Sequence, residues 1–252
     1  MSQKNLIPNR LFGLNVMGYF ERAELLLGAD RMKRLHDLRV IIFGVGGVGG
    51  WCAESLVRTG VGHITIVDFD DVAESNVNRQ VMATPATVGM PKIESMRKRL
   101  IEINPDADIK AVRQRYDADT AHKFDLDAYD YIIDAIDSLE CKALLICNAL
   151  LTDATLFSSM GAARRFDPRK VNVTEFWKVK GCPLARALRQ RFKKSKSMPR
   201  RKFLCVYSDE TPAPAQQSQQ GSAKAPNGSL MQVTATFGLT LTALIIDDIR
   251  RK

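Results

Sequence analysis

A glycine-rich segment near the start of the chain has the spacing of a phosphate-binding turn. Gly44, Gly46 and Gly49 lie in GVGGVG, directly after the apolar run Arg39–Phe43. Glycines at these positions allow a tight turn, close approach of the backbone to phosphate oxygens, and close helix packing. Asp68, 19 residues beyond Gly49, is placed to accept hydrogen bonds from ribose hydroxyls. The pattern predicts a nucleotide site, and by itself it also suits a nicotinamide or flavin enzyme.

Cationic side chains after Asp68 favour a triphosphate ligand over a redox cofactor. The segment DFDDVAESNVNRQ contains Arg79, and VGMPK brings Lys92 to the start of a predicted helix. A guanidinium or an ammonium neutralises phosphate oxygens, whereas hydride transfer has no obvious use for either at these places. Each cation alone is more typical of a surface ion pair, but the two together favour ATP.

Two carboxylates end the run DYIIDAIDS. Asp134 and Asp137 lie at the carboxyl end of a predicted parallel strand, where open α/β sheets bind their ligands. Because Mg²⁺ prefers carboxylate oxygens, we predict a magnesium site here. Asp137 is the first candidate ligand and Asp134 the second.

These residues are positioned by alternating apolar strands and helices. Strands are predicted at 39–43, 63–67, 108–112 and 129–133 and near Leu156, and helices at 48–58, 91–103 and 139–151. This alternation is typical of a parallel sheet with helices on both faces. We therefore expect an α/β, Rossmann-like, doubly wound fold.

The rhythm changes after Gly161, where a mixed-sheet extension is predicted. It comprises strands at 171–177 and 203–208, an amphipathic helix at 183–194, a flexible loop at 209–229 and an apolar helix at 235–249. That last helix is shorter than the roughly 20 residues that span a bilayer, so we expect it to be buried. We expect one domain over 1–252, with a core at 19–161, a basic extension at 162–208, the loop, and a terminal helix at 230–252.

Most of the positive charge lies in one stretch. The 252-residue chain has 37 Lys and Arg against 28 Asp and Glu, yet 176–208 holds 11 of the basic residues and no acidic one. A local excess of this kind favours a polyanionic partner such as RNA, with a merely solvated basic helix as the alternative. The candidate nucleic-acid contacts are Lys178, Arg186, Arg189, Lys193, Lys194 and Arg201.

Composition excludes several classes of protein. With 45% hydrophobic and 26% charged residues, the chain is neither collagen-like nor disordered. Five cysteines without a C-x-x-C pair, and no secretory leader, indicate a cytoplasmic protein without a zinc site. We expect Cys52 to pack in the core and Cys182 to be structural rather than a nucleophile.

Five motifs between about Tyr19 and Gly161 follow one another in a distinctive order: GVGGVG, VDFDDVAESNVNRQ, VGMPK, INP and DAIDS. This order resembles the superfamily of ubiquitin-activating enzymes and bacterial adenylyltransferases for sulfur-carrier proteins. Three later segments, GAARRFDPRKVNVTEF, CPLARALRQRFKK and VYSDETP, resemble its tRNA threonylcarbamoyladenosine dehydratase branch. Members of that branch close a ring on the modified adenosine beside the anticodon.

The resemblance implies a role for each matching residue. ATP would be held by Gly44, Gly46, Gly47, Gly49, Asp68, Asp70, Asn76, Asn78 and Ser138, with Arg79, Lys92 and Asp137 at the phosphates and magnesium. Arg22, in YFERAELLLG, would reach the nucleotide site of a partner subunit, which implies a homodimer. A sulfur-transfer or redox partner protein is also compatible with the resemblance.

The implied reaction activates a carboxylate. Attack of the substrate carboxylate on the α-phosphate of ATP gives an acyl-adenylate, and the carbamoyl group of the same nucleoside then closes the ring. One alternative is adenylation of the C-terminal glycine of a ubiquitin-like or sulfur-carrier protein, but those enzymes usually carry two zinc-binding C-x-x-C pairs. A nucleotide-binding regulator or redox enzyme without adenylation is the other.

Overall fold

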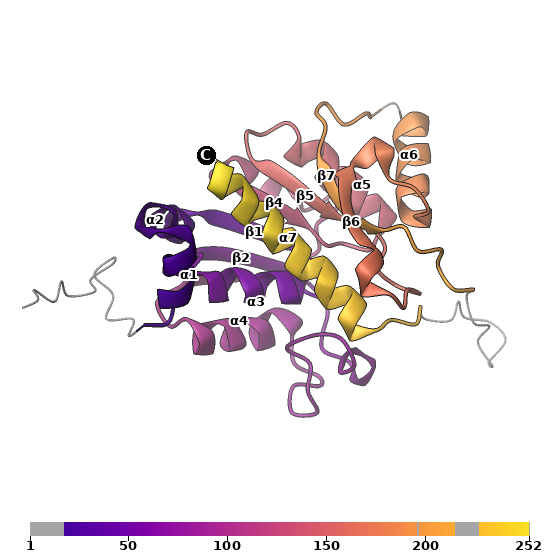
Figure 1. The fold of residues 1–252 in the computed structure, drawn as a ribbon. Helices are drawn as coiled ribbons and strands as arrows, with labels where there is room; N and C mark the ends of the chain where they lie inside the picture. Colours follow the sequence, from indigo (N-terminus) through magenta and orange to yellow (C-terminus); the bar gives the residue numbers. More distant parts are fainter. Residues whose placement is uncertain (1–17, 196, 215–226, 252) are drawn as a thin grey trace, which may run out of the picture.

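A seven-stranded sheet organises the computed structural model, which describes residues 18–195, 197–214 and 227–251 (Figure 1). Its strands are β1 (Arg39–Phe43), β2 (His63–Asp68), β3 (Asp108–Arg113), β4 (Tyr131–Asp134), β5 (Thr155–Ser159), β6 (Val171–Glu175) and β7 (Leu204–Ser208). The strand order is β3-β2-β1-β4-β5-β7-β6, with only the β6–β7 pair antiparallel. The predicted doubly wound, mainly parallel sheet with a mixed extension is confirmed.

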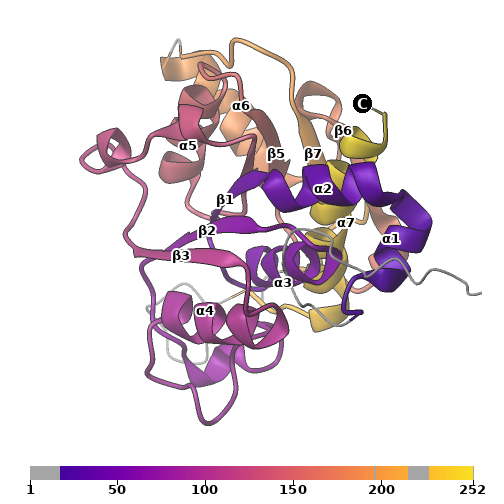
Figure 2. The ribbon, with the colours of Figure 1, turned by 90° about the vertical axis from the view of Figure 1, so that its left-hand side faces the viewer.

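Helices cover both faces of this sheet (Figure 2). They are α1 (Glu21–Leu27), α2 (Ala29–Asp37), α3 (Gly49–Thr59), α4 (Lys92–Ile103), α5 (Leu139–Ala149), α6 (Pro183–Ser195) and α7 (Met231–Arg251). Val40 and Ile42 of β1 belong to the core that includes α2, α3, α4 and α7, while Ile41 and Phe43 belong to the core that includes α5 and α6. Alternation along a strand buried on both faces explains why its sequence is apolar throughout.

Helix α7 is longer than the apolar helix predicted at 235–249. The prediction that this helix is too short to span a membrane is therefore wrong. Its 21 residues are long and apolar enough to cross a bilayer. In the structure it packs along α3, with Phe237 and Leu241 fully buried. A Cβ at Gly238 would lie 2.5 Å from the carbonyl oxygen of Val48, so glycine permits close contact between the two helices. Burial of one face makes α7 a core helix.

Several predicted boundaries are also corrected. Helices α1 and α2 were not predicted, and Pro91 precedes α4 as its N-cap rather than forming its first residue. The strand predicted to reach residue 177 ends at Glu175, whose carboxylate accepts the Trp177 backbone N–H at 3.1 Å and starts a short 3-10 turn. The loop predicted at 209–229 is held at both ends, as described below, while residues 215–226 lie outside the described residues.

Candidate active site

A cavity of about 860 Å³ opens at the carboxyl edge of the parallel strands. Loops that follow β1, β2, β3, β4 and β5 line it, as expected for an open α/β sheet. Of the residues predicted to bind nucleotide, it is lined by Gly44, Gly46, Gly47, Asp68, Asp70, Asn76, Arg79, Lys92, Asp137 and Ser138. The fold therefore gathers most of the predicted nucleotide site in one place.

Two glycines of the turn are required sterically, and a third leaves its backbone open to the cavity. Gly44 adopts φ +85°, and a Cβ there would lie 2.8 Å from the carbonyl oxygen of Ala135. A Cβ at Gly49, which starts α3 outside the cavity wall, would lie 1.8 Å from the carbonyl oxygen of Gly44. A Cβ at Gly46 meets nothing closer than 3.7 Å, so its backbone is open to the cavity. This shape fits the close approach of a phosphate group.

Asp68 ties the glycine turn to the next strand. Its Oδ2 accepts the Val45 backbone N–H at 2.9 Å and its Oδ1 accepts the Asp70 N–H at 3.0 Å. The carboxylate is nearly buried on the cavity wall. Since each carboxylate oxygen has two lone pairs, Asp68 can hold the turn and still accept a ribose hydroxyl.

Two cations line the cavity close to the glycine turn. Lys92 is buried, and its Nζ lies 2.7 Å from Oδ2 of Asp70. Arg79 donates from Nη1 to the carbonyl oxygen of Ser75 at 2.7 Å and to Oδ1 of Asn78 at 3.0 Å. These contacts orient both cations before any ligand binds, which is the preorganisation that favours binding of phosphate oxygens.

The two asparagines occupy different places. Asn76 lines the cavity, and its Oδ1 accepts the Ala73 backbone N–H at 3.1 Å. Asn78 lies outside the cavity lining, where its Nδ2 donates to the carbonyl oxygen of Ser229 at 2.9 Å. Because Oδ1 of Asn78 also accepts a hydrogen bond from Arg79, Asn78 helps to orient that guanidinium.

The structure separates the two candidate magnesium ligands. Asp134 is fully buried; its Oδ2 lies 2.8 Å from Nζ of Lys142 and accepts the Ser158 hydroxyl at 2.7 Å. The same Lys142 Nζ donates to the carbonyl oxygen of Ile136 at 2.9 Å, which fixes the turn that leads to Asp137. Asp134 is therefore part of the support beneath the site and does not line the cavity.

Asp137 is exposed to the cavity and makes no ion pair with the described residues. Magnesium at nucleotide sites is usually held by one or two carboxylates together with substrate phosphates. A single carboxylate without an ion pair, beside a glycine turn that a phosphate group can approach, fits that requirement.

Sequence reasoning missed several residues of the cavity wall, including Gln80, Arg115 and Arg165. Arg115 lies with its guanidinium carbon 5.5 Å from the centre of the Phe69 ring, and its Nε donates to Sγ of Cys141 at 3.4 Å. Both arginines follow predicted strands at the carboxyl edge. Their positions after β3 and β5 are the sequence signal that indicates a place near the cavity.

The predicted RNA contacts fall into two groups. Lys178, Arg186, Lys193 and Lys194 are exposed. Arg189 instead donates to the carbonyl oxygens of Phe176, Trp177 and Val179 at 2.9–3.3 Å, and Arg201 donates to those of Thr152 and Ala154. Those two guanidinium groups join the basic helix and its flanking segment to the rest of the fold.

Arg22 lies apart from the cavity of its own chain. It is exposed on α1 and is absent from the cavity lining. On the same helix Leu25 and Leu26 are 82% and 85% exposed. Arg22 and these two leucines are thus exposed together on one short helix.

Three buried cysteines, Cys52, Cys182 and Cys205, lie outside the cavity lining, whereas Cys141 lines it. Burial raises the pKa of the Cys52 thiol to about 12, and that of Cys205 also rises through burial. Cys182 is buried in the apolar core beside α6. The structure thus agrees with core packing for Cys52 and a structural place for Cys182.

This chain is similar to known proteins both in sequence and in structure. The ThiF family model matches residues 20–241. The tRNA threonylcarbamoyladenosine dehydratase of Bacillus subtilis is 34% identical over 240 residues, covering 91% of this chain and 94% of the relative. The structure of the E. coli tRNA N6-threonylcarbamoyladenosine dehydratase in complex with ATP matches with a TM-score of 0.83 at 33% identity, covering 92% and 94% of the two chains.

A relative of a different activity matches a smaller part. The molybdopterin-synthase adenylyltransferase of Salmonella typhimurium is 34% identical over 175 residues, which is 69% of this chain and 68% of the relative. Similarity to the dehydratases thus extends over a larger share of the chain.

Proposed function

Since the chain belongs to the ThiF family, we propose that it is a tRNA threonylcarbamoyladenosine dehydratase that uses ATP to cyclise its modified adenosine. The observation that carries the proposal is the composition of the cavity. Its wall combines the glycine turn with Gly161–Arg165 and with residues of α6, which belong to the extension after the nucleotide-binding core. Both relatives named as dehydratases match this chain over more than nine-tenths of its length.

The proposed reaction is the one that similarity to the dehydratases implies, and the charges around the cavity suit it. The threonyl carboxylate attacks the α-phosphorus of ATP, and pyrophosphate leaves. Arg79 and Lys92 stabilise the negative charge that develops on the phosphate oxygens, and Asp68 orients the ribose. Asp137 would hold Mg²⁺, and a bound Mg²⁺ would neutralise part of the charge of the triphosphate.

Ring closure then needs no nucleophile from the protein. A carbamoyl nitrogen of the same nucleoside attacks the activated carbonyl, AMP leaves with one carboxylate oxygen, and the nitrogen loses its proton. Tethering of the two groups on one nucleoside supplies the effective concentration. The absence of a role for Cys182 is consistent with its burial.

The direct test uses purified protein, ATP, magnesium and tRNA that carries threonylcarbamoyladenosine. Mass analysis of the digested nucleosides is expected to show a product lighter by one water, with formation of AMP and pyrophosphate. In cells that lack the protein, tRNA is expected to retain the uncyclised nucleoside. ATP–pyrophosphate exchange that depends on a carrier protein instead of tRNA would favour the second candidate, to which the molybdopterin-synthase relative points.

We predict that the exposed cations of α6 bind the tRNA backbone. Changing Arg186, Lys193 and Lys194 together to Gln is expected to weaken tRNA binding at physiological salt concentration and to leave ATP affinity unchanged. Each lost phosphate contact should flatten the slope of log affinity against log salt by roughly 0.7–0.9. An unaltered slope would assign tRNA recognition to another surface.

Arg189→Gln is the matched control on the same helix. Because Arg189 donates to three backbone carbonyls, its loss is expected to lower the free energy of unfolding by about 1–3 kcal/mol. The triple variant, whose side chains are exposed, should unfold at the wild-type temperature.

We further propose a homodimer in which Arg22 completes the partner's site. Arg22→Ala and Lys92→Ala dimers are each expected to be nearly inactive. After subunit exchange in an equal mixture, about a quarter of wild-type activity should return, because half of the dimers are mixed and one of their two sites is intact. Mixed dimers that stay inactive, with exchange verified by mass, would place both residues in the same subunit's site.

A further inference from the structure

Arg165 is a buried arginine whose guanidinium is hydrogen-bonded at only one of its three nitrogens within the described residues. The residue is 2% exposed, lines the cavity, and follows β5. Within the described residues, its Nε and Nη1 have no hydrogen-bond partner, and its Nη2 donates only to the carbonyl oxygen of Gly181 at 3.4 Å. Buried polar groups in folded proteins are almost always satisfied, so this exception points to a partner that the chain itself does not supply.

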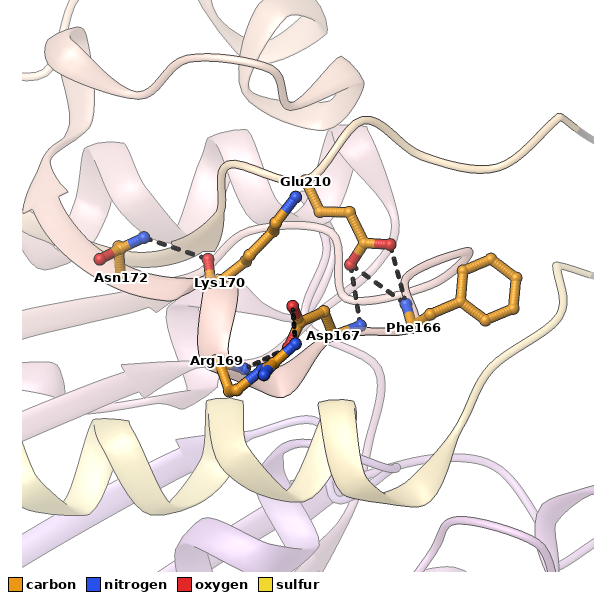
Figure 3. A network of polar contacts seen from close by, with 6 residues as sticks. All are labelled: Phe166, Asp167, Arg169, Lys170, Asn172 and Glu210. Atoms are coloured by element: carbon orange, nitrogen blue, oxygen red, sulfur yellow. Dashed lines mark hydrogen bonds and ion pairs between the residues drawn. The ribbon is translucent and has the colours of Figure 1, made fainter.

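The charge on Arg165 makes the missing partner an anion. Guanidinium stays protonated in proteins, even though burial lowers its pKa here. The neighbouring carboxylate, Glu210, is already used: it accepts the backbone N–H groups of Phe166 and Asp167 at 3.0–3.1 Å (Figure 3). Arg165 forms no ion pair within 4.0 Å among the described residues, and the carboxylates of Glu210 and Asp209 act on its charge only from a greater distance.

The segment that carries Arg165 is held on both sides. Glu210 holds the two following residues, as Figure 3 shows. On the preceding side, the Arg164 backbone N–H donates to the carbonyl oxygen of Gly228 at 2.8 Å, and the Arg164 carbonyl oxygen accepts the Ala213 N–H at 2.9 Å. Arg164 has φ +60°, an unfavourable conformation for a residue with a side chain that persists because its surroundings impose it.

The order of strands places Arg165 beyond the nucleotide. Along the carboxyl edge, the loops run in the order Asp68 after β2, the glycine turn after β1, Asp137 after β4 and Arg165 after β5. Adjacent strands lie about 4.8 Å apart, so β5, which precedes Arg165, lies about three strand spacings from β2, which ends in Asp68. Under the proposed function, phosphates at the glycine turn and Asp137 would leave the β5 end of the cavity for the second substrate.

We infer that Arg165 binds an anionic oxygen of the RNA substrate at the β5 end of the cavity. The inference rests on the proposed function and adds a specificity-determining residue to it. Two groups of this substrate carry the required negative charge: the carboxylate of the threonyl group and a backbone phosphate next to the modified nucleoside. Both take the two-pronged contacts that a guanidinium offers.

Equilibrium binding without ATP tests the inference and separates the two sources. The probes are two anticodon stem-loop RNAs of one sequence, one with threonylcarbamoyladenosine and one with unmodified adenosine. Loss of a charge-assisted contact in Arg165→Gln is expected to weaken binding about ten- to a hundredfold. Weakening confined to the modified RNA assigns Arg165 to the carboxylate, and equal weakening of both RNAs assigns it to a phosphate. Unchanged binding of both would overturn the inference.

Arg165→Met and Arg169→Gln complete the experiment. A buried, unpaired charge retained for binding costs stability, so Arg165→Met should unfold at or above the wild-type temperature and bind ATP normally. A large fall in its unfolding temperature together with loss of ATP binding would make Arg165 a structural residue and overturn the inference. Arg169, exposed and paired with Asp167, is the control whose substitution should alter neither RNA.

Conversion of the modified RNA by the wild-type protein with ATP is measured in parallel. If wild type converts it while Arg165→Gln binds and converts it normally, the inference fails and the proposed function stands. If wild type binds both RNAs and converts neither, the proposed function fails.

Discussion

Replacing Asp137 by asparagine is expected to reduce tRNA-dependent ATP–pyrophosphate exchange by about a hundred- to a thousandfold, the usual effect of removing one electrostatic contact to the transition state. The reason is geometric: within the described part of the chain, Asp137 is a free carboxylate beside the glycine turn, and Asn offers a neutral, weaker metal ligand. ATP should still bind detectably, because Gly44–Gly47 and Asp68 remain in place. Filter binding or calorimetry with ATP separates the two effects.

Glu140→Gln is the matched control for Asp137→Asn. Glu140 lies three residues further on, in the first turn of α5, where it is exposed and pairs with Arg191 outside the cavity. Its substitution should leave exchange near the wild-type rate, since surface pairs contribute little. An active Asp137→Asn enzyme would remove the metal role from Asp137. Asp134 is not then the replacement, because its carboxylate is buried against Lys142.

Gly49→Ala is expected to be severely destabilising and to abolish ATP binding. The added Cβ would lie 1.8 Å from the carbonyl oxygen of Gly44, and backbone cannot move aside as a flexible side chain can. Displacing this turn also breaks the 2.9 Å bond from Val45 N–H to Asp68. A loss of more than about 3 kcal/mol is expected, beyond ordinary overpacking of a core. At about 2–4 °C per kcal/mol, the midpoint of thermal unfolding should fall by roughly 10 °C.

Gly46→Ala separates the steric role from the binding role. Its Cβ would meet nothing closer than 3.7 Å, so the protein should unfold at the wild-type temperature. The methyl group would enter the space where phosphate approaches, and ATP affinity should fall. Equal stability of the Gly49→Ala and wild-type proteins would show that the turn relaxes, and the close contact would then not explain the glycine.

The part of the cavity around the glycine turn could be predicted because its information is local. Gly44, Asp68 and Asp137 each follow a short apolar strand, and parallel strands bring their carboxyl ends to one edge. Strand type and the position of a residue at a strand end are set by neighbours in the chain. Sequence alone therefore determined the sheet class, the edge that carries the cavity, and many of the residues that line it.

Tertiary structure decided which of several similar side chains is already paired within the protein and which is left to bind a ligand. Asp134 and Asp137 are three residues apart in one motif, yet only a lysine from the following helix, Lys142, neutralises the first. Arg186 and Arg189 lie on one basic helix, but Arg189 meets carbonyls of a turn ten or more residues earlier in the chain. Partners of this kind depend on how separate elements pack, which periodicity along one element does not contain.

Arg165 shows the same limit most clearly. The sequence analysis assigned it no role, and the structure buries its guanidinium, with one hydrogen bond to the carbonyl oxygen of Gly181. The sequence alone shows that a cation follows β5. Only the packing of the extension against the core removed that cation from water and left two of its nitrogens unpaired, because burial and hydrogen-bond satisfaction are properties of the assembled fold.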